Sequence, residues 1–188
     1  MASRLRTGLA LATAPWLACH APPSPAPATP ENVVQILRTG DAIGVILPVA
    51  AGSALLSPCT RVRPQGIDAP WHPSARDVER FEAALPELVQ HHKQCFGEDR
   101  SDNLRRYRRQ YTGFWRGGER HLYVNFVPTR VVAREFADSW FLGPVGYCDG
   151  GHTYFGAEFN LEAGAFVAVE FDHDFSGSNG PCGSIRPG

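Results

Sequence analysis

One short segment, residues 146–156, brings together side chains that could act as a nucleophile, an acid or a base. It reads GYCDGGHTYFG and contains Cys148, Asp149 and His152. A Cys148 thiolate beside His152 would form a nucleophilic pair, because histidine can take the proton of a neighbouring thiol. The glycines tolerate a positive φ, so the same residues also fit a tight turn before a strand, with Cys148 in a disulfide. We prefer this bridged turn over a reactive pair or a recognition loop, because the N-terminus predicts export to an oxidising compartment.

A second group of potential ligands lies in DHDFSGSNG, residues 172–180. Asp172, Asp174 and Ser176 occupy alternating positions, as oxygen ligands do in the first half of an EF-hand calcium loop. The twelfth position is Gly183, where that loop needs a bidentate glutamate. Calcium would therefore need a carboxylate from elsewhere, and a polar loop without metal is the preferred interpretation. No other cofactor is expected.

The N-terminus has the pattern of an export signal. Arg4 and Arg6 precede an eleven-residue stretch, residues 7–17, that is mostly apolar and too short to span a hydrocarbon core of about 30 Å. The WLAC sequence that ends at Cys19 resembles the lipobox of bacterial lipoproteins. That resemblance implies cleavage of residues 1–18 as a signal peptide and lipid attachment at Cys19.

Two features define the rest of the expected organisation. Residues 19–30 are rich in proline and should form an extended tether, and residues 31–188 are long enough for a single folded domain.

Trp16 departs from the lipobox preference for leucine, which leaves open ordinary cleavage after residues 26–28. We therefore expect a membrane-anchored lipoprotein of the cell envelope, or a periplasmic or secreted protein if the lipid is not attached.

The other four cysteines are an even number in a compartment that favours oxidation, which predicts two disulfides. They are Cys59, Cys95, Cys148 and Cys182, and their spacing is not that of zinc ligands. Three connectivities are possible. We favour Cys59 with Cys95 and Cys148 with Cys182, since each bridge would close a loop of only about 35 residues.

The periodicity of apolar residues predicts an α+β domain, with one main helix packed on a roughly four-stranded antiparallel sheet. A capping box at Ser74 and Asp77 should begin that helix, and Pro86 should kink or split it. A shorter helix is expected over residues 30–40, followed by a strand over residues 42–47.

The four sheet strands are expected as two hairpins. Alternating residues on either side of Gly117-Gly118 predict the first, and two alternating segments about Gly164 predict the second.

Parts of these hairpins resemble a group of bacterial exported proteins that carry no assigned function. The resemblance lies in RQYTGFWRGGERHLYVNF and CDGGHTYFGAEFNLEAGAFVAVEF, and its clearest marks are Arg109-Gln110-Tyr111, Asn125 and Cys148-Asp149-Gly150-Gly151. It covers about the C-terminal half of the chain and implies an exported location and a fold, but no catalytic residue. The order of elements is also similar to that of cystatin-like folds.

Arginines and aromatic residues alternate around the first hairpin. The arginines are Arg105, Arg106, Arg108, Arg109, Arg116 and Arg120. In a cytosolic protein such a cluster would suggest nucleic-acid binding, but export and a formal net charge of −1 argue against that partner. A solvated sheet face is the preferred interpretation, and an anionic lipid, polysaccharide or protein partner stays open.

We therefore expect an exported, lipid-anchored envelope protein with a non-catalytic binding or structural role. Its expected partners are the membrane, through Cys19, and an unknown envelope protein or surface ligand. The alternative is a hydrolase-like extracytoplasmic enzyme that uses Asp149 and His152 with Asp172 or Asp174. The sequence has no HExxH, GxSxG or phosphate-binding glycine loop to support the alternative.

Overall fold

The computed structural model describes residues 33–40, 42–96, 104–174, 176–177 and 182–187. The predicted signal peptide, tether and lipid-bearing cysteine lie outside these residues. Within them, the strands follow the order β1-β2-β4-β5-β6-β7-β8, and β3 pairs with β4 outside that path.

The strands are β1 (Gln35–Thr39), β2 (Ala42–Ile46), β3 (Ala69–Trp71), β4 (Tyr107–Arg116), β5 (Glu119–Pro128), β6 (Phe155–Asn160), β7 (Ala165–Phe171) and β8 (Ser184–Ile185). The α-helices are α1 (Val49–Gly52), α2 (Ala75–His91), α3 (Lys93–Phe96) and α5 (Thr129–Glu135). The 3₁₀ turns in the described segments are η2 (Ser53–Leu56), η3 (Leu104–Arg106) and η4 (Gly151–Thr153).

The predicted architecture of one helix on a four-stranded antiparallel sheet is wrong. The sheet has eight strands and is mixed, because β2 runs parallel to β4. The two predicted hairpins form β4 with β5 and β6 with β7, but they are only the centre of the sheet. Of the strands that the prediction lacked, β3 and β8 are only three and two residues long, so local periodicity gives little sign of them.

The first expected helix is also wrong, because that segment forms β1. Its apolar residues Val33, Ile36 and Leu37 have helical spacing, but Gly40 adopts a φ of 58° and turns the chain back. Strand β1 then pairs with β2 in an antiparallel hairpin, so Ile36 lies opposite Val45. The predicted strand over residues 42–47 is confirmed as β2.

The main helix is confirmed as α2. The Ser74 hydroxyl accepts a hydrogen bond from the Asp77 backbone N–H at 3.3 Å, and the Asp77 carboxylate accepts one from the Ser74 backbone N–H at 2.9 Å. These reciprocal bonds satisfy amides that the first helical turn leaves free. Pro86 lies within the helix and does not split it.

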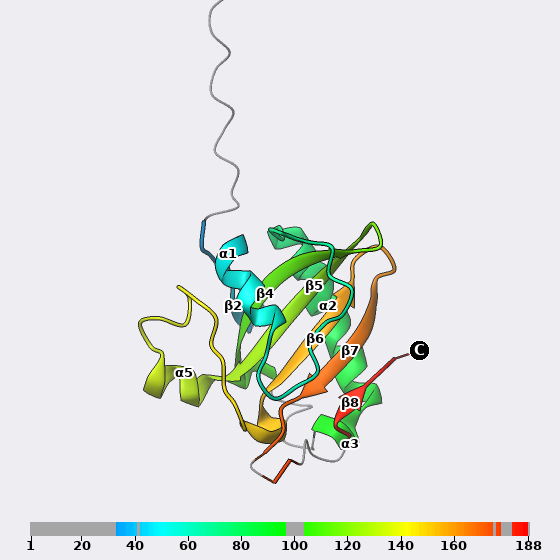
Figure 1. Cartoon of the computed structure of the whole chain (residues 1–188). Coiled ribbons are helices and arrows are strands. Elements are labelled where there is room, and N and C mark those ends of the chain that lie inside the picture. Colours follow the sequence, from blue (N-terminus) through cyan, green and yellow to red (C-terminus); the bar gives the residue numbers. More distant parts are fainter. Residues whose placement is uncertain (1–32, 41, 97–103, 175, 178–181, 188) are drawn as a thin grey trace, which may run out of the picture.

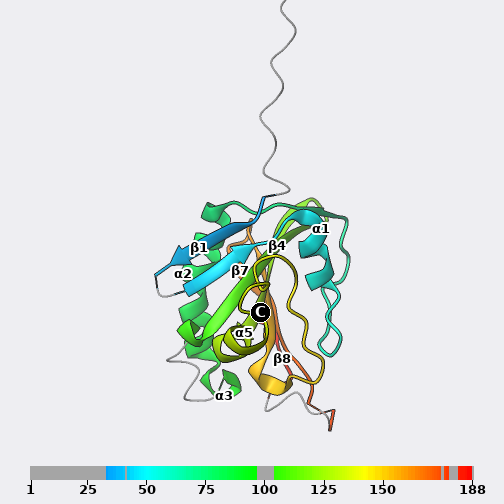
Figure 2. The ribbon, with the colours of Figure 1, turned by 90° about the vertical axis from the view of Figure 1, so that its left-hand side faces the viewer.

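Both faces of the sheet are covered, as the two views in Figures 1 and 2 show. Helix α2 packs on the first face, where the Phe81 ring contacts those of Tyr111, Phe126 and Phe159. Helix α1, η2, α5 and irregular segments cover the second face, around Phe114 and other apolar residues. Because strand residues alternate between faces, this double coverage buries nearly every residue in the centre of β4 and β5.

The prediction that the arginine cluster lies on a solvated sheet face is wrong for Arg109. Its side chain is 2% exposed, and its Nε lies 2.9 Å from the carboxylate of Glu82 on α2. Glu82 also accepts a hydrogen bond from the Tyr111 hydroxyl at 2.8 Å. Burial raises the pKa of Glu82, and the Arg109 charge opposes that rise. Arg109 therefore belongs to a buried polar contact between helix and sheet.

Two disulfides are present, as the cysteine count predicts. Their connectivity differs from the prediction, because Cys59 pairs with Cys148 and Cys95 pairs with Cys182. The bridges span 89 and 87 residues in sequence, so each joins segments that only the folded sheet brings together. Two disulfides are typical of an oxidising compartment and are compatible with export. None of the helices in the described segments is long and apolar enough to cross a membrane.

Candidate ligand-binding site

Residues 57–68, which we call the strap, form neither helix nor strand and connect η2 to β3. The disulfide of Cys59 ties one end of the strap to the loop before η4. The backbone N–H of Asp68 ties the other end to the carbonyl of Trp115 on β4, at 2.8 Å. Between these two points the strap lies against the second face of the sheet, where Arg61 meets residues of β5.

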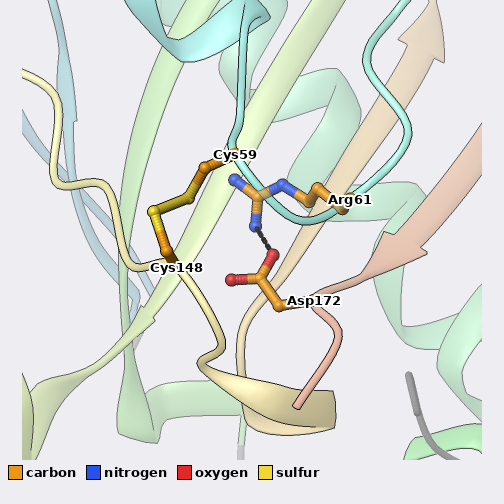
Figure 3. Close-up of a disulfide and its surroundings, with 4 residues drawn as sticks. All are labelled: Cys59, Arg61, Cys148 and Asp172. Atoms are coloured by element: carbon orange, nitrogen blue, oxygen red, sulfur yellow. Dashed lines mark hydrogen bonds and ion pairs between the residues drawn. A yellow bond between two sulfur atoms is a disulfide. The ribbon is translucent and has the colours of Figure 1, made fainter. Parts of the chain in front are cut away.

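The Arg61 side chain is 6% exposed, and Figure 3 shows its guanidinium directed at Asp172. Its Nε donates to the Tyr123 hydroxyl at 2.9 Å, and its Nη2 donates to Asn125 Oδ1 at 2.5 Å. Its Nη1 donates to Asp172 Oδ1 at 3.1 Å, just beyond the end of β7. Three partners therefore hold the guanidinium in one orientation.

Asn125 presents its oxygen to Arg61 because its amide hydrogens are used elsewhere. The Asn125 Nδ2 donates to Gln110 Oε1 at 3.1 Å and to the Val145 carbonyl at 2.9 Å. Gln110 in turn donates to the Trp140 and Gly143 carbonyls at 2.6 and 2.7 Å. This buried network fixes the loop that includes Val145 and leaves Asn125 Oδ1 as the acceptor for the strap.

Gly156 on β6 makes room for this arrangement. Because Gly156 lies opposite Asn125 in the register, it is beside the Arg61 side chain. A Cβ atom at this position would lie 2.2 Å from the Tyr123 hydroxyl oxygen and 3.1 Å from Arg61 Nε. The close approach of the strap therefore requires a residue without a side chain at position 156.

Asp172 is buried, and among the described residues only one of its two oxygens has a partner. The residue is 3% exposed, and Oδ1 forms the ion pair with Arg61. Oδ2 has no hydrogen-bond partner among the described residues, and in Figure 3 one oxygen points away from the guanidinium. Burial raises the pKa of Asp172 to about 6, although the charge of Arg61 opposes the rise.

These groups line a pocket of about 320 Å³ on the second face, which we call the strap pocket. Its polar part is formed by Arg61, Asn125 and Asp172. Its other walls are mainly apolar and include Leu55, Val145, Tyr154 and the Cys59–Cys148 bridge. The ring of Tyr154 stacks on that of Tyr147, with centroids 4.8 Å apart and planes inclined by 21°.

The interpretation of residues 146–156 as a bridged turn is confirmed. Cys148 is in a disulfide, so its sulfur is not a free nucleophile beside His152. Asp149 and Gly151 have φ values of 61° and 62°, the left-handed conformation that a tight turn uses. The Gly151 N–H then donates to the His173 carbonyl at 3.0 Å, which joins the turn to the segment that carries Asp172.

The residues of the predicted calcium loop make different contacts. Asp172 pairs with Arg61, whereas Asp174 Oδ1 accepts bonds from the Ser176 backbone N–H at 2.8 Å and hydroxyl at 2.6 Å. Residues 175 and 178–181 of this loop lie outside the description. Among the residues that the structure describes, no group of three or more His, Cys, Asp or Glu side chains could hold a metal ion. Calcium binding stays a prediction.

The structure brings together only some of the residues of the hydrolase-like alternative. Asp149, His173 and Asp174 line a neighbouring open pocket of about 520 Å³, which shares Cys59 and Arg61 with the strap pocket. Asp172 lines the strap pocket instead, and His152 is not among the residues that line either of these two pockets.

Sequence reasoning missed Arg61 and Tyr123 as parts of a site. Neither lies in a recognisable motif, and their contact joins residues 62 positions apart. Asn125 and Cys148 were singled out by the resemblance, and both line the strap pocket. An arginine two residues from a predicted disulfide cysteine was the available signal, but it does not indicate where the side chain lies.

The chain matches no protein-family model, no curated protein and no solved structure.

Proposed function

We propose that this protein is an exported, lipid-anchored, non-catalytic binding protein whose ligand occupies the strap pocket. The observation that supports binding most directly is the buried Arg61–Asp172 pair at the wall of an open cavity. Removing two charges from water costs several kcal/mol, and apolar residues of similar volume often give equal or greater stability. Buried ionisable groups that converge on a concave, mostly apolar pocket are typical of ligand sites.

A binding role fits this site better than catalysis. Arg61 and Asp172 hold each other at 3.1 Å, and the nearby sulfur atoms are joined in a disulfide. The hydrolase-like alternative would need an acid and a base that share one pocket with the substrate. Asp149 and Asp174 line the neighbouring pocket, Asp172 lines the strap pocket, and His152 lines neither, so that alternative has less support.

The proposal includes the membrane as a partner, through lipid on Cys19. The tether of residues 19–30 would hold the domain away from the bilayer, where the strap pocket could meet an envelope ligand. The resemblance to bacterial exported proteins supports this location.

Binding can be tested with a small-molecule extract from the envelope of the native cells as the probe. The oxidised domain is incubated with the extract, desalted and analysed by native mass spectrometry. The wild type should retain a compound that Arg61→Ala does not retain. Arg63→Ala, which changes an exposed strap residue, should behave as the wild type. Equal retention by Arg61→Ala, with both disulfides intact, would contradict the proposed site, as would retention by neither protein.

A further inference from the structure

The charges in the strap pocket cancel. Among the described residues that line it, Arg61 and Asp172 alone carry charge, and they are 3.1 Å apart. An anion that approached the guanidinium would also meet the carboxylate, and a cation that approached the carboxylate would meet the guanidinium. A ligand with a single charge therefore gains little, and a neutral polar ligand is the better electrostatic match.

The remaining hydrogen-bonding groups form a donor beside an acceptor. A guanidinium has five N–H bonds, and three of those on Arg61 are used by Tyr123, Asn125 and Asp172. One N–H on each Nη atom is left for a ligand. No other described residue takes Oδ2 of Asp172, which is left as an acceptor. A ligand that suits both must accept from Arg61 and donate to Asp172, which two adjacent hydroxyl groups do.

The other walls suit the apolar face of a sugar ring. Leu55, Val145 and Tyr154 offer carbon surface opposite the polar groups, and the disulfide adds sulfur. A sugar ring has hydroxyl groups around its edge and C–H groups on its faces, so it can fill a pocket with one polar wall. The volume of about 320 Å³ is near the lower limit for small-molecule sites, which favours one or two rings over a longer chain.

We propose that the strap pocket binds a neutral saccharide, holding two adjacent hydroxyl groups between Arg61 and Asp172. This inference rests on the proposed binding function and names the ligand class for the same site. In the proposed complex, Asn125 is a positioning residue. Its amide oxygen holds Arg61, and both of its amide hydrogens are already donated to Gln110 and Val145.

The test uses the oxidised domain and saturation-transfer NMR with named probes: glucose, galactose, mannose, N-acetylglucosamine and their β-linked disaccharides. At least one should bind. For that sugar, the deoxy analogue that lacks one of the two hydroxyl groups should bind at least about tenfold more weakly, because a site built for a hydroxyl leaves polar groups unpaired without it. This comparison uses unaltered protein, so it does not depend on whether a variant folds.

Protein variants then locate the bound sugar. Asp172→Asn and Arg61→Lys should each weaken binding at least about tenfold, whereas Arg63→Ala should leave it unchanged. Equal affinity of Asp172→Asn and the wild type would overturn the proposal, because the sugar would then lie elsewhere. Glycine and acetate serve as charged probes, and binding of either in place of the sugars would also overturn it.

The outcome separates this inference from the proposed function. If the wild type retains an envelope compound in an Arg61-dependent way but binds none of these sugars, the saccharide inference fails and the binding function stands. If neither experiment gives Arg61-dependent binding, both fail.

Discussion

The two disulfides should differ in their response to a thiol reductant. Cys59 and Cys148 are both exposed, whereas Cys95 is buried and packs in the core against α2 and the first face of the sheet. Thiol–disulfide exchange requires a thiolate to reach a sulfur atom, so access governs its rate. Dithiothreitol at a low concentration should therefore reduce Cys59–Cys148 first, giving two protein thiols and oxidised reductant, while Cys95–Cys182 stays intact.

The entropy of chain closure does not distinguish the two bridges. Their sequence separations of 89 and 87 residues correspond to nearly equal restraints on the unfolded chain, about 4.6 kcal/mol each in the chain-entropy model. This value lies near the top of the stability that is typically lost when a native disulfide is removed, about 2–5 kcal/mol. The expected order of reduction thus depends on exposure and not on loop length.

The structural consequences of the two reductions also differ. Loss of the Cys59 bridge frees one end of the strap, and Arg61 is only two residues away. We expect the strap pocket to lose its ligand while the core retains α2 and the central hairpins. Loss of the Cys95 bridge removes a link between α3 and the segment before β8. It should therefore lower the melting temperature, while the strap keeps its position in the folded protein.

The assay is a time course of reduction, alkylation with iodoacetamide and peptide mass spectrometry, run in parallel with thermal melting. Cys59→Ser/Cys148→Ser provides the matched control for the first bridge, and Cys95→Ser/Cys182→Ser for the second. Alkylation of Cys95 before Cys59, or simultaneous alkylation of all four thiols in folded protein, would refute the reasoning from exposure.

Three further predictions concern single residues. Gly156→Ala should destabilise the strap by about 1–3 kcal/mol, since its Cβ would overlap the Tyr123 hydroxyl; urea unfolding measures this, with Gly143→Ala, which meets no atom within 4 Å, as the control. Asp172 has its pKa raised to about 6 from an ordinary value near 3.8, so the folded state binds this proton more tightly. The free energy of unfolding should therefore fall as pH rises from about 4 to about 6. The Asp172→Asn variant should not show this part of the pH dependence, and urea titrations at several pH values measure the difference. Labelled palmitate should enter the wild type and not Cys19→Ser; equal labelling would contradict the anchor.

Local signals in the sequence predicted the elements that depend on nearby residues. The capping box of Ser74 and Asp77 defines the start of α2, because both partners lie within one helical turn. Gly117-Gly118 and Gly164 identify the two central hairpins, because a tight turn needs residues that accept a positive φ at that point. The cysteine count also predicted two disulfides without any knowledge of the fold.

Contacts between residues that are distant in sequence could not be predicted from local patterns. Strand β2 pairs in parallel with β4 across a long connection that contains α2, so neither segment carries a mark of its partner. The same helical spacing of Val33, Ile36 and Leu37 that predicts a helix is compatible with β1 once β2 supplies its hydrogen bonds. Disulfide connectivity follows from this topology, since each bridge joins segments nearly 90 residues apart.

The candidate site shows the same division. The sequence alone indicated a bridged turn at Cys148, and it supplied Asn125 through a resemblance. It did not show that the strap would carry Arg61 onto the second face of the sheet, because an isolated arginine in an irregular segment is usually solvated. The tertiary structure decides this position: the Cys59 bridge, the space above Gly156 and the fixed amide of Asn125 together make burial of the guanidinium favourable. Each of these three features lies on a different segment, and only the folded sheet brings all of them around the Arg61 side chain.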